Sequence, residues 1–169
     1  AYIVQKLIRT AFGNNNVDTC ARVCHSPTGY GLKQTFGTSA GTQNFDSVLE
    51  SDVILIIGAN PIVAHPVFAS QIKKRIKQGA KLIVADPRRT EIVESPHIKA
   101  DYHLPLLPGS NVPLINAFSH VAVTEKLIDQ NYIDQRCDIE SFNDWKEFIS
   151  LDIHAPENVE TATGLNATQ

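Results

Sequence analysis

The sequence contains no methionine, only three cysteines and a single tryptophan among its 169 residues. So small and odd a number of cysteines does not make a disulfide framework, which favours a reducing compartment. No stretch reaches the roughly 20 apolar residues that a membrane-spanning helix needs, and the first residues lack the apolar run of a signal peptide. We therefore expect a soluble, cytoplasmic protein without a membrane segment.

An excess of positive charge is also lacking, because the formal net charge is −3. Domains that grip phosphate backbones usually carry a basic excess, so nucleic acid is not expected as a partner. The chain starts without methionine and stops where a further helix is expected to begin. These two features predict a piece of a longer protein.

A strand, a helix and a second strand follow one another in the middle of the chain. Residues 53–57 form an apolar, β-branched run that is typical of a strand buried on both faces. Residues 65–78 have the period of a helix, with Ile72 and Ile76 four apart on its apolar face. Residues 81–85 form a second apolar run. This order predicts a βαβ unit with two parallel strands, and hence an α/β fold.

The elements around this unit are less sharply marked. We expect helices over residues 2–12, 27–37, 44–50 and 112–126, a third, edge-like strand over 101–106, and a patchier helical tail to residue 149. Ser26 followed by Pro27 is typical of an N-cap and a first helical position. Residues 59–61 are expected to form a turn. We treat residues 1–169 as one domain.

Polar residues follow both predicted strands, where parallel sheets bind ligands. Gly58 would let a ligand approach the backbone, and Asn60 can both donate and accept hydrogen bonds. After the second strand, Asp86 can accept two donors and Arg88 can bind a phosphate with two N–H groups. Together these residues favour a nucleotide site, although turn residues chosen for backbone geometry would explain each group alone. The sequence has no GxGxxG motif, which weakens an ordinary nicotinamide interpretation.

A cysteine and a histidine stand side by side just before the helix expected at Ser26. The positive end of that helix and a neighbouring imidazolium would favour the thiolate form of Cys24, a soft metal ligand. His25 can take up or release a proton near neutral pH. Buried packing is the favoured interpretation of Cys20 and remains an equal alternative for Cys24. A zinc site from Cys20, Cys24 and a histidine is weakly supported, because no second cysteine pair completes it.

At this point the residues resemble the pterin-cofactor domain of molybdenum- and tungsten-dependent formate dehydrogenases, within the wider molybdopterin oxidoreductase family. The most specific segment is NVDTCARVCHSP, because relatives that act on nitrate or sulfoxides differ at the Cys-His pair. The similarity covers essentially the whole chain, and its segments occur in the family's order: residues 16–27 (NVDTCARVCHSP), 37–40 (GTSA), 58–61 (GANP), 65–66 (HP), 79–88 (GAKLIVADPR) and 107–111 (LPGSN).

This resemblance implies a three-layer α/β sandwich with a mostly parallel, Rossmann-like sheet of the formate dehydrogenase and dimethyl sulfoxide reductase type. It implies that Cys24 ligates molybdenum or tungsten in place of selenocysteine, and that His25 lies beside the metal as a proton acceptor. The cofactor would be bis-molybdopterin guanine dinucleotide. The resemblance assigns one guanine-dinucleotide arm to Gly58, Asn60, Asp86, Arg88, Gly109, Ser110 and Asn111.

The implied activity is the two-electron oxidation of formate to carbon dioxide, with electrons leaving through iron–sulfur clusters to an acceptor, NAD. A [4Fe–4S] cluster and partner subunits carrying iron–sulfur or flavin groups would lie outside this chain, which alone is expected to be inactive. Two alternatives stay open, namely a cofactor-less structural subunit of a respiratory NADH dehydrogenase and a plain nucleotide-binding module. The choice between molybdenum and tungsten, and between hydride and proton transfer, also stays open.

Overall fold

The computed structural model describes residues 2–168, and its contacts divide the chain into two compact units, residues 1–45 and 46–169. Each unit is described by itself, and the interpretation of the chain as one cofactor-binding domain stays a prediction. Within residues 2–168, no helix has both the length and the apolar character needed to cross a membrane.

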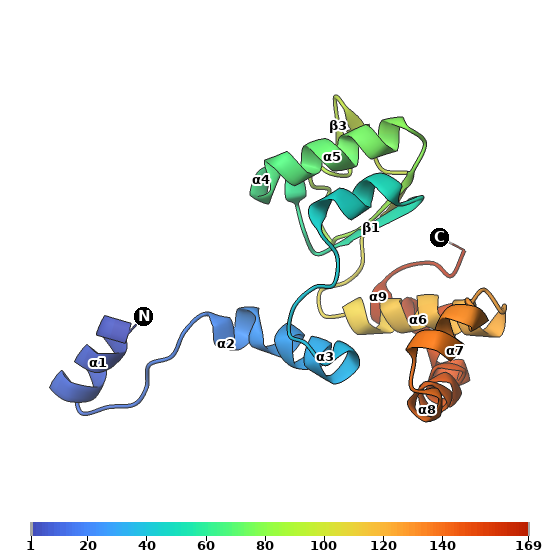
Figure 1. Ribbon diagram of the computed structural model, residues 1–169. Helices are drawn as coiled ribbons and strands as arrows, with labels where there is room; N and C mark the ends of the chain where they lie inside the picture. Colours follow the sequence, from blue (N-terminus) through green and yellow to red (C-terminus); the bar gives the residue numbers. More distant parts are fainter. Residues whose placement is uncertain (1, 169) are drawn as a thin grey trace. The chain divides into compact units, whose positions relative to one another are not determined.

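The first unit is built of three helices (Figure 1), and none of them contains a buried residue: α1 Tyr2–Ala11, α2 Ala21–Cys24 and α3 Ser26–Phe36. The helix predicted over residues 2–12 is confirmed. The helix predicted up to Gly37 is confirmed as well, because Gly37 adopts a left-handed conformation with φ of 73° and its N–H bonds the carbonyl of Lys33.

The predicted N-cap at Ser26 is wrong. Ser26 lies inside α3, whose N-cap is His25, and His25 itself has right-handed helical backbone angles. The hydroxyl of Ser26 donates backwards to the carbonyl of Ala21 at 2.9 Å instead of capping forwards. A one-turn helix that leads almost directly into α3 leaves no extended residue in which a serine could act as a cap.

The second unit carries all the strands of the described residues, and its helices follow the predicted order with added short turns. Its elements are η1 Phe45–Glu50, which spans the boundary, then β1 Val53–Ile57, α4 Pro61–Ala64, α5 Pro66–Lys77, β2 Lys81–Ala85, β3 Glu94–Ser95, β4 Ile98–Lys99, β5 Tyr102–Leu104, α6 Asn111–Thr124, α7 Gln130–Arg136, α8 Ile139–Ile149, η2 Asp152–His154 and α9 Pro156–Thr163. The antiparallel pair of β3 and β4 was not predicted.

Three strands form a parallel sheet in the order β1-β2-β5. β1 pairs with β2 from Val53 opposite Lys81 to Ile57 opposite Ala85, which confirms the βαβ unit. β5 pairs with β2 on its other side and confirms the third, edge-like strand. The mixed α/β class with a parallel sheet is therefore observed.

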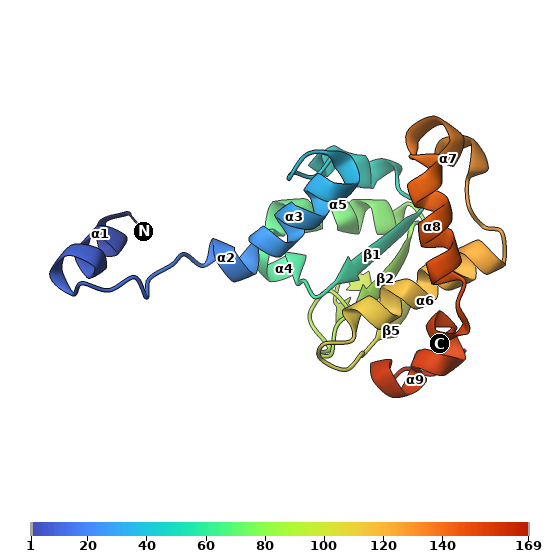
Figure 2. The same ribbon diagram turned by 90° about the horizontal axis from the view of Figure 1, so that it is seen from below.

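Helices lie on both faces of this sheet (Figure 2). On one face, Ile72 of α5 packs with Ile54 and Leu82 in the larger core cluster. On the other face, Leu114 of α6 packs with Ala85 and Leu104 in a second cluster. β2 is thus held between α5 and α6.

The expectation that β1 is buried on both faces is wrong. Its side chains alternate, with Ile54 and Ile56 buried but Val53 57% and Leu55 40% exposed. β1 is an edge strand of the sheet, and the second core cluster gathers around β2 and β5 instead. An apolar run alone does not distinguish a central strand from an edge strand with one uncovered face.

Asp101 joins the end of the β4 segment to the start of β2. Its two carboxylate oxygens accept from Lys81 Nζ at 2.7 Å and from the backbone N–H of Leu82 at 2.9 Å. The hydrogen bond from Lys81 and then that from Leu82 lower the pKa of Asp101 below its ordinary value of 3.8. The same contact raises the pKa of Lys81.

We expect Asp101→Asn to lower the melting temperature at pH 7. A carboxyl group with a lowered pKa in the folded state contributes stability above its unfolded value, and the contribution is lost as the pH falls through the folded value. The difference between wild type and Asp101→Asn should therefore shrink as the pH falls below about 4. Calorimetry from pH 7 to pH 3 measures it, and a difference independent of pH would contradict the assignment.

Candidate functional site

The candidate site lies at the carboxyl edge of the sheet, directly after β1. Gly58 has a left-handed φ of 59°, and a Cβ at this position would meet no atom within 4 Å. Its N–H donates to the carbonyl of Ala85 at 3.0 Å, which ties the end of β1 to the end of β2. Glycine is therefore needed for the backbone angle, and its open side leaves room for a ligand to approach.

Asn60 follows two residues later and forms the N-cap position of α4. The turn predicted over residues 59–61 is wrong at its last residue, because Pro61 already begins this short helix. Proline suits the first helical turn, where its missing N–H is not needed. The result is that Asn60 is held immediately between the strand end and the helix.

Asp86 and Arg88 follow β2 at the same edge. Asp86 is only 4% exposed, and its Oδ1 accepts from the backbone N–H of Arg88 at 2.8 Å. The main chain of Asp86 is held from the side of β5, because its N–H donates to the carbonyl of Leu104 and its carbonyl lies 3.0 Å from His103 Nε2. At least one carboxylate oxygen of Asp86 therefore shapes the loop. The side chain of Arg88 is 80% exposed, with Nε 3.7 Å from Asp86.

We expect Asp86→Ala to destabilise the loop after β2 by about 1–3 kcal/mol, because it leaves the N–H of Arg88 without its acceptor. Asp86→Asn keeps an acceptor oxygen and should retain most of the stability. Thermal unfolding of each variant measures the effect. A wild-type melting temperature in Asp86→Ala would contradict this role of Asp86.

A polar cleft of about 860 Å³ opens between the two loops, and it unites residues that follow β1 with residues that follow β2. Its lining comprises Asn60, Val63, Ala64, Arg88, Arg89, Thr90, Glu91 and Glu94. The predicted Asn60 and Arg88 therefore share one cleft. Arg89 forms an ion pair with Glu94 across it.

Two buried oxygens at this cleft lack a hydrogen-bond partner. They are Oδ1 of Asn60 and Oγ1 of Thr90. Buried polar atoms are nearly always paired, so each unpaired oxygen marks a place where a ligand or water completes the network. Thr90 was missed in the sequence, and the signal that could have found it is its position in the loop that begins at Asp86.

Glu91 was missed as well, although it contacts the predicted Asn60. Its Oε2 accepts from Asn60 Nδ2 at 2.6 Å. The backbone N–H of Glu91 itself, then the Asn60 amide, and more weakly the charge of Arg88 lower the pKa of this carboxyl. The loop after β2 thus reaches back to the residue that follows β1.

The Gly109-Ser110-Asn111 segment follows β5. Because β5 is parallel to β2, this turn lies at the same edge of the sheet as the other two loops. Gly109 has a φ of 88° with open space beside its Cα. Ser110 is buried and its hydroxyl donates to the carbonyl of Leu107 at 2.6 Å, while Asn111 is exposed at the first position of α6. Within this turn, Asn111 is the side chain available to a ligand.

The Cys24-His25 pair belongs to the first unit, whose placement relative to the cleft is not defined. Cys24 ends α2, its thiol is free, and its Sγ lies 3.7 Å from His25 Nε2. Both residues are exposed. The alternative of buried packing for Cys24 therefore finds no support, and buried packing of Cys20 is wrong, because Cys20 is exposed too.

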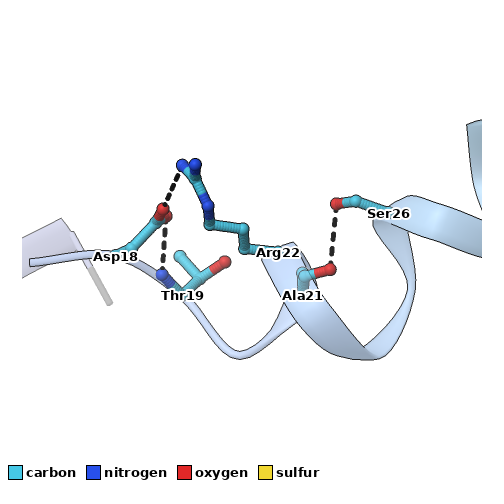
Figure 3. A network of polar contacts seen from close by, with 5 residues as sticks. All are labelled: Asp18, Thr19, Ala21, Arg22 and Ser26. Atoms are coloured by element: carbon cyan, nitrogen blue, oxygen red, sulfur yellow. Dashed lines mark hydrogen bonds and ion pairs between the residues drawn. The ribbon is translucent and has the colours of Figure 1, made fainter.

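A polar network fixes the turn that carries these cysteines (Figure 3). The carboxylate of Asp18 accepts from the N–H of Thr19 at 2.8 Å and pairs with Arg22 at 3.0 Å. These contacts, that of Thr19 first, lower the pKa of Asp18. With the Ser26 bond to Ala21, they hold α2 at both ends.

A zinc site from Cys20, Cys24 and a histidine is not formed. Among the described residues 2–168, no three histidine, cysteine, aspartate or glutamate side chains are grouped so that they could hold a metal ion. Any metal at Cys24 would therefore take its other ligands from outside this set. Cysteine sulfur remains available as a single soft ligand.

These features define an α/β protein with a polar cleft at the carboxyl edge of a parallel sheet and an exposed thiol at Cys24. A model of the molybdopterin oxidoreductase family matches residues 1–155. The chain belongs to this family.

Curated relatives and a solved structure agree with this assignment. The chain is 37% identical over 168 residues to formate dehydrogenase H of Escherichia coli (99% of this chain, 22% of the relative). It is 40% identical over 165 residues to the F420-dependent formate dehydrogenase subunit alpha of Methanocaldococcus jannaschii (98% and 23%). The structure of acetylene hydratase from Pelobacter acetylenicus matches with a TM-score of 0.71 and 26% identity, over 99% of this chain and 22% of that one. The chain spans about a fifth of the length of these relatives.

The family implies a molybdenum or tungsten pterin cofactor, and the residues present fit such a group. The cleft has two unpartnered buried acceptors, Asn60 Oδ1 and Thr90 Oγ1, for the N–H and O–H groups of a nucleotide. The exposed guanidinium of Arg88 suits a phosphate. The exposed Sγ of Cys24 suits a soft metal.

Proposed function

We propose that this chain is part of the catalytic subunit of a molybdenum- or tungsten-dependent formate dehydrogenase. The observation that carries the proposal is the exposed Cys24-His25 pair, with its sulfur and imidazole nitrogen 3.7 Å apart. It is supported by relatives named formate dehydrogenases that match nearly the whole chain. The reaction is the conversion of formate to carbon dioxide, one proton and two electrons.

The cofactor in this proposal is bis-molybdopterin guanine dinucleotide, bound by a three-layer α/β sandwich to which the observed sheet belongs. When bound, its metal centre supplies the two-electron redox chemistry. Cys24 provides one sulfur ligand through Sγ. The cleft at the carboxyl edge of the sheet holds one guanine-dinucleotide arm. Gly58, Gly109, Ser110 and Asn111 belong to loops at the same edge of the sheet and complete the site.

Individual side chains have distinct tasks at this arm. Arg88 neutralises the diphosphate, since its guanidinium is exposed and a guanidinium can donate two N–H groups to one anion. Asn60 accepts through Oδ1 from an N–H of guanine or an O–H of ribose. Asp86 holds the loop between them through the N–H of Arg88.

His25 acts as the proton acceptor in this proposal. Its imidazole accepts the proton that leaves when formate becomes carbon dioxide and passes it to solvent, to which the residue is exposed. The imidazole lies beside the Cys24 sulfur, with Nε2 3.7 Å from Sγ. The pair therefore places a proton acceptor beside the redox centre.

The electrons leave through iron–sulfur clusters in the rest of the subunit and in partner subunits, in a cytoplasmic enzyme whose acceptor is NAD. Three relatives are named F420-dependent, so the two acceptors are to be compared directly. Reduction of NAD by formate, with no reduction of F420, is the expected result. The reverse preference would contradict this choice of acceptor.

The function is tested on the anaerobically purified full-length protein. Metal analysis should find molybdenum or tungsten, and formate should be converted to carbon dioxide with reduction of a viologen dye. A protein with neither metal and no bound nucleotide would be the cofactor-less NADH dehydrogenase homologue. A protein that binds guanine nucleotide without either metal would be the plain nucleotide-binding module.

A further inference from the structure

The Asn60 amide is held in one orientation by a residue from another loop. Asn60 Nδ2 donates to Glu91 Oε2 at 2.6 Å, across 31 residues of sequence. An ionised carboxylate can only accept, so the amide must turn its nitrogen toward Glu91 and its oxygen away. The lowered pKa of Glu91 keeps the carboxyl ionised near neutral pH. The carboxylate of Glu91 therefore fixes the orientation of the Asn60 amide.

The other end of the same amide is unsatisfied. Asn60 Oδ1 is buried and has no donor, although Asn60 lines the cleft. A buried acceptor without a donor costs free energy, about as much as a lost hydrogen bond. A ligand that brings an N–H or O–H group to this oxygen recovers that cost, whereas a ligand with an acceptor there does not.

We propose that Glu91 is a positioning residue for the nucleotide arm of the cofactor: it fixes the Asn60 amide so that Oδ1, which has no partner, is left as the acceptor for the ligand. This rests on the proposed function, since it takes the cleft as a guanine-nucleotide site. It assigns the cleft a preference for a ligand that donates at Asn60. Glu91 itself does not touch the ligand.

Electrostatics alone makes the opposite prediction. The carboxylate of Glu91 lines a cleft that would hold an anionic diphosphate, and the two negative charges repel each other. If charge alone mattered, removal of Glu91 would relieve this repulsion and strengthen binding. Positioning requires that its removal weaken binding. The sign of the effect therefore separates the two.

The test titrates GDP, as the probe, into the cofactor-free full-length protein by isothermal titration calorimetry. We expect Glu91→Ala to weaken GDP binding about tenfold, the equivalent of one lost hydrogen bond. Glu125→Ala is the matched control, because it removes an exposed carboxylate that lies outside the cleft. It should bind GDP as tightly as wild type.

Exchanging the amide and the carboxylate between positions 60 and 91 distinguishes a loss of positioning from a folding defect. Asn60→Asp alone places two carboxylates face to face and should weaken binding tenfold or more. The double variant Asn60→Asp/Glu91→Gln restores one donor, one acceptor and the total charge, with a free oxygen again facing the ligand. It should bind GDP within about threefold of wild type, and Glu91→Gln alone completes the cycle.

Each outcome decides something. Tighter or unchanged GDP binding by Glu91→Ala would overturn the positioning role while leaving the nucleotide site standing. A double variant as weak as Asn60→Asp alone would overturn it as well. A wild-type chain that binds no GDP would contradict the proposed nucleotide site, and the positioning role would fall with it.

Discussion

Cys24→Ser in the full-length protein should lower kcat for formate oxidation by more than about a hundredfold. Loss even of a group that merely supports a metal ligand costs 10- to 100-fold, and Cys24 is proposed as the ligand itself. Serine is nearly the same size, but its hydroxyl is a harder and far less acidic donor than a thiol. Because Cys24 is exposed, the exchange should leave the melting temperature unchanged.

The matched control for this variant is Cys20→Ser. Cys20 lies four residues earlier on the same segment, is equally free and exposed, and has no proposed role. It should oxidise formate at the wild-type rate. If Cys20→Ser and Cys24→Ser had equal activity, whether both were active or both inactive, the result would contradict the role of Cys24 as the metal ligand.

His25→Gln should lower kcat about 10²- to 10⁴-fold, the usual contribution of a positioned proton acceptor, with little change in the KM for formate. Glutamine keeps a polar side chain of similar reach, so the loss reports proton transfer. Steady-state kinetics of the loaded enzyme measure it, and metal content per protein should match wild type.

His97→Gln serves as the control for His25→Gln, because His97 is exposed in the second unit and has no role in the reaction. Its kinetics should equal those of wild type. If His25→Gln turns over formate as fast as His97→Gln does, another group accepts the proton. A rise in KM without a fall in kcat would make His25 a binding residue instead.

Much of the fold could be predicted because the spacing of apolar residues along the chain indicates which side chains are buried. The apolar period of residues 65–78 and the two flanking runs predicted the βαβ unit, and the observed register of β1 on β2 confirms it. The exposure of Val53 and Leu55 could not be predicted from the run itself. It depends on where α6 packs, and that is set by contacts distant in sequence.

The candidate site was predicted in part. Strand-end position identified Asn60 and Arg88, which the structure places in one cleft. Glu91 escaped notice because its contact with Asn60 spans 31 residues and involves no motif. Ser26 was misjudged as a cap because the sequence pattern does not reveal that α2 precedes α3 almost without a break.

The most direct test of the account is X-ray absorption at the molybdenum or tungsten edge of the full-length protein, compared between wild type and Cys24→Ser. We predict that the variant has one sulfur neighbour fewer at the metal, with the metal retained. Identical sulfur coordination in the two proteins, or no molybdenum or tungsten in a wild-type protein with intact Cys24, would contradict the assignment.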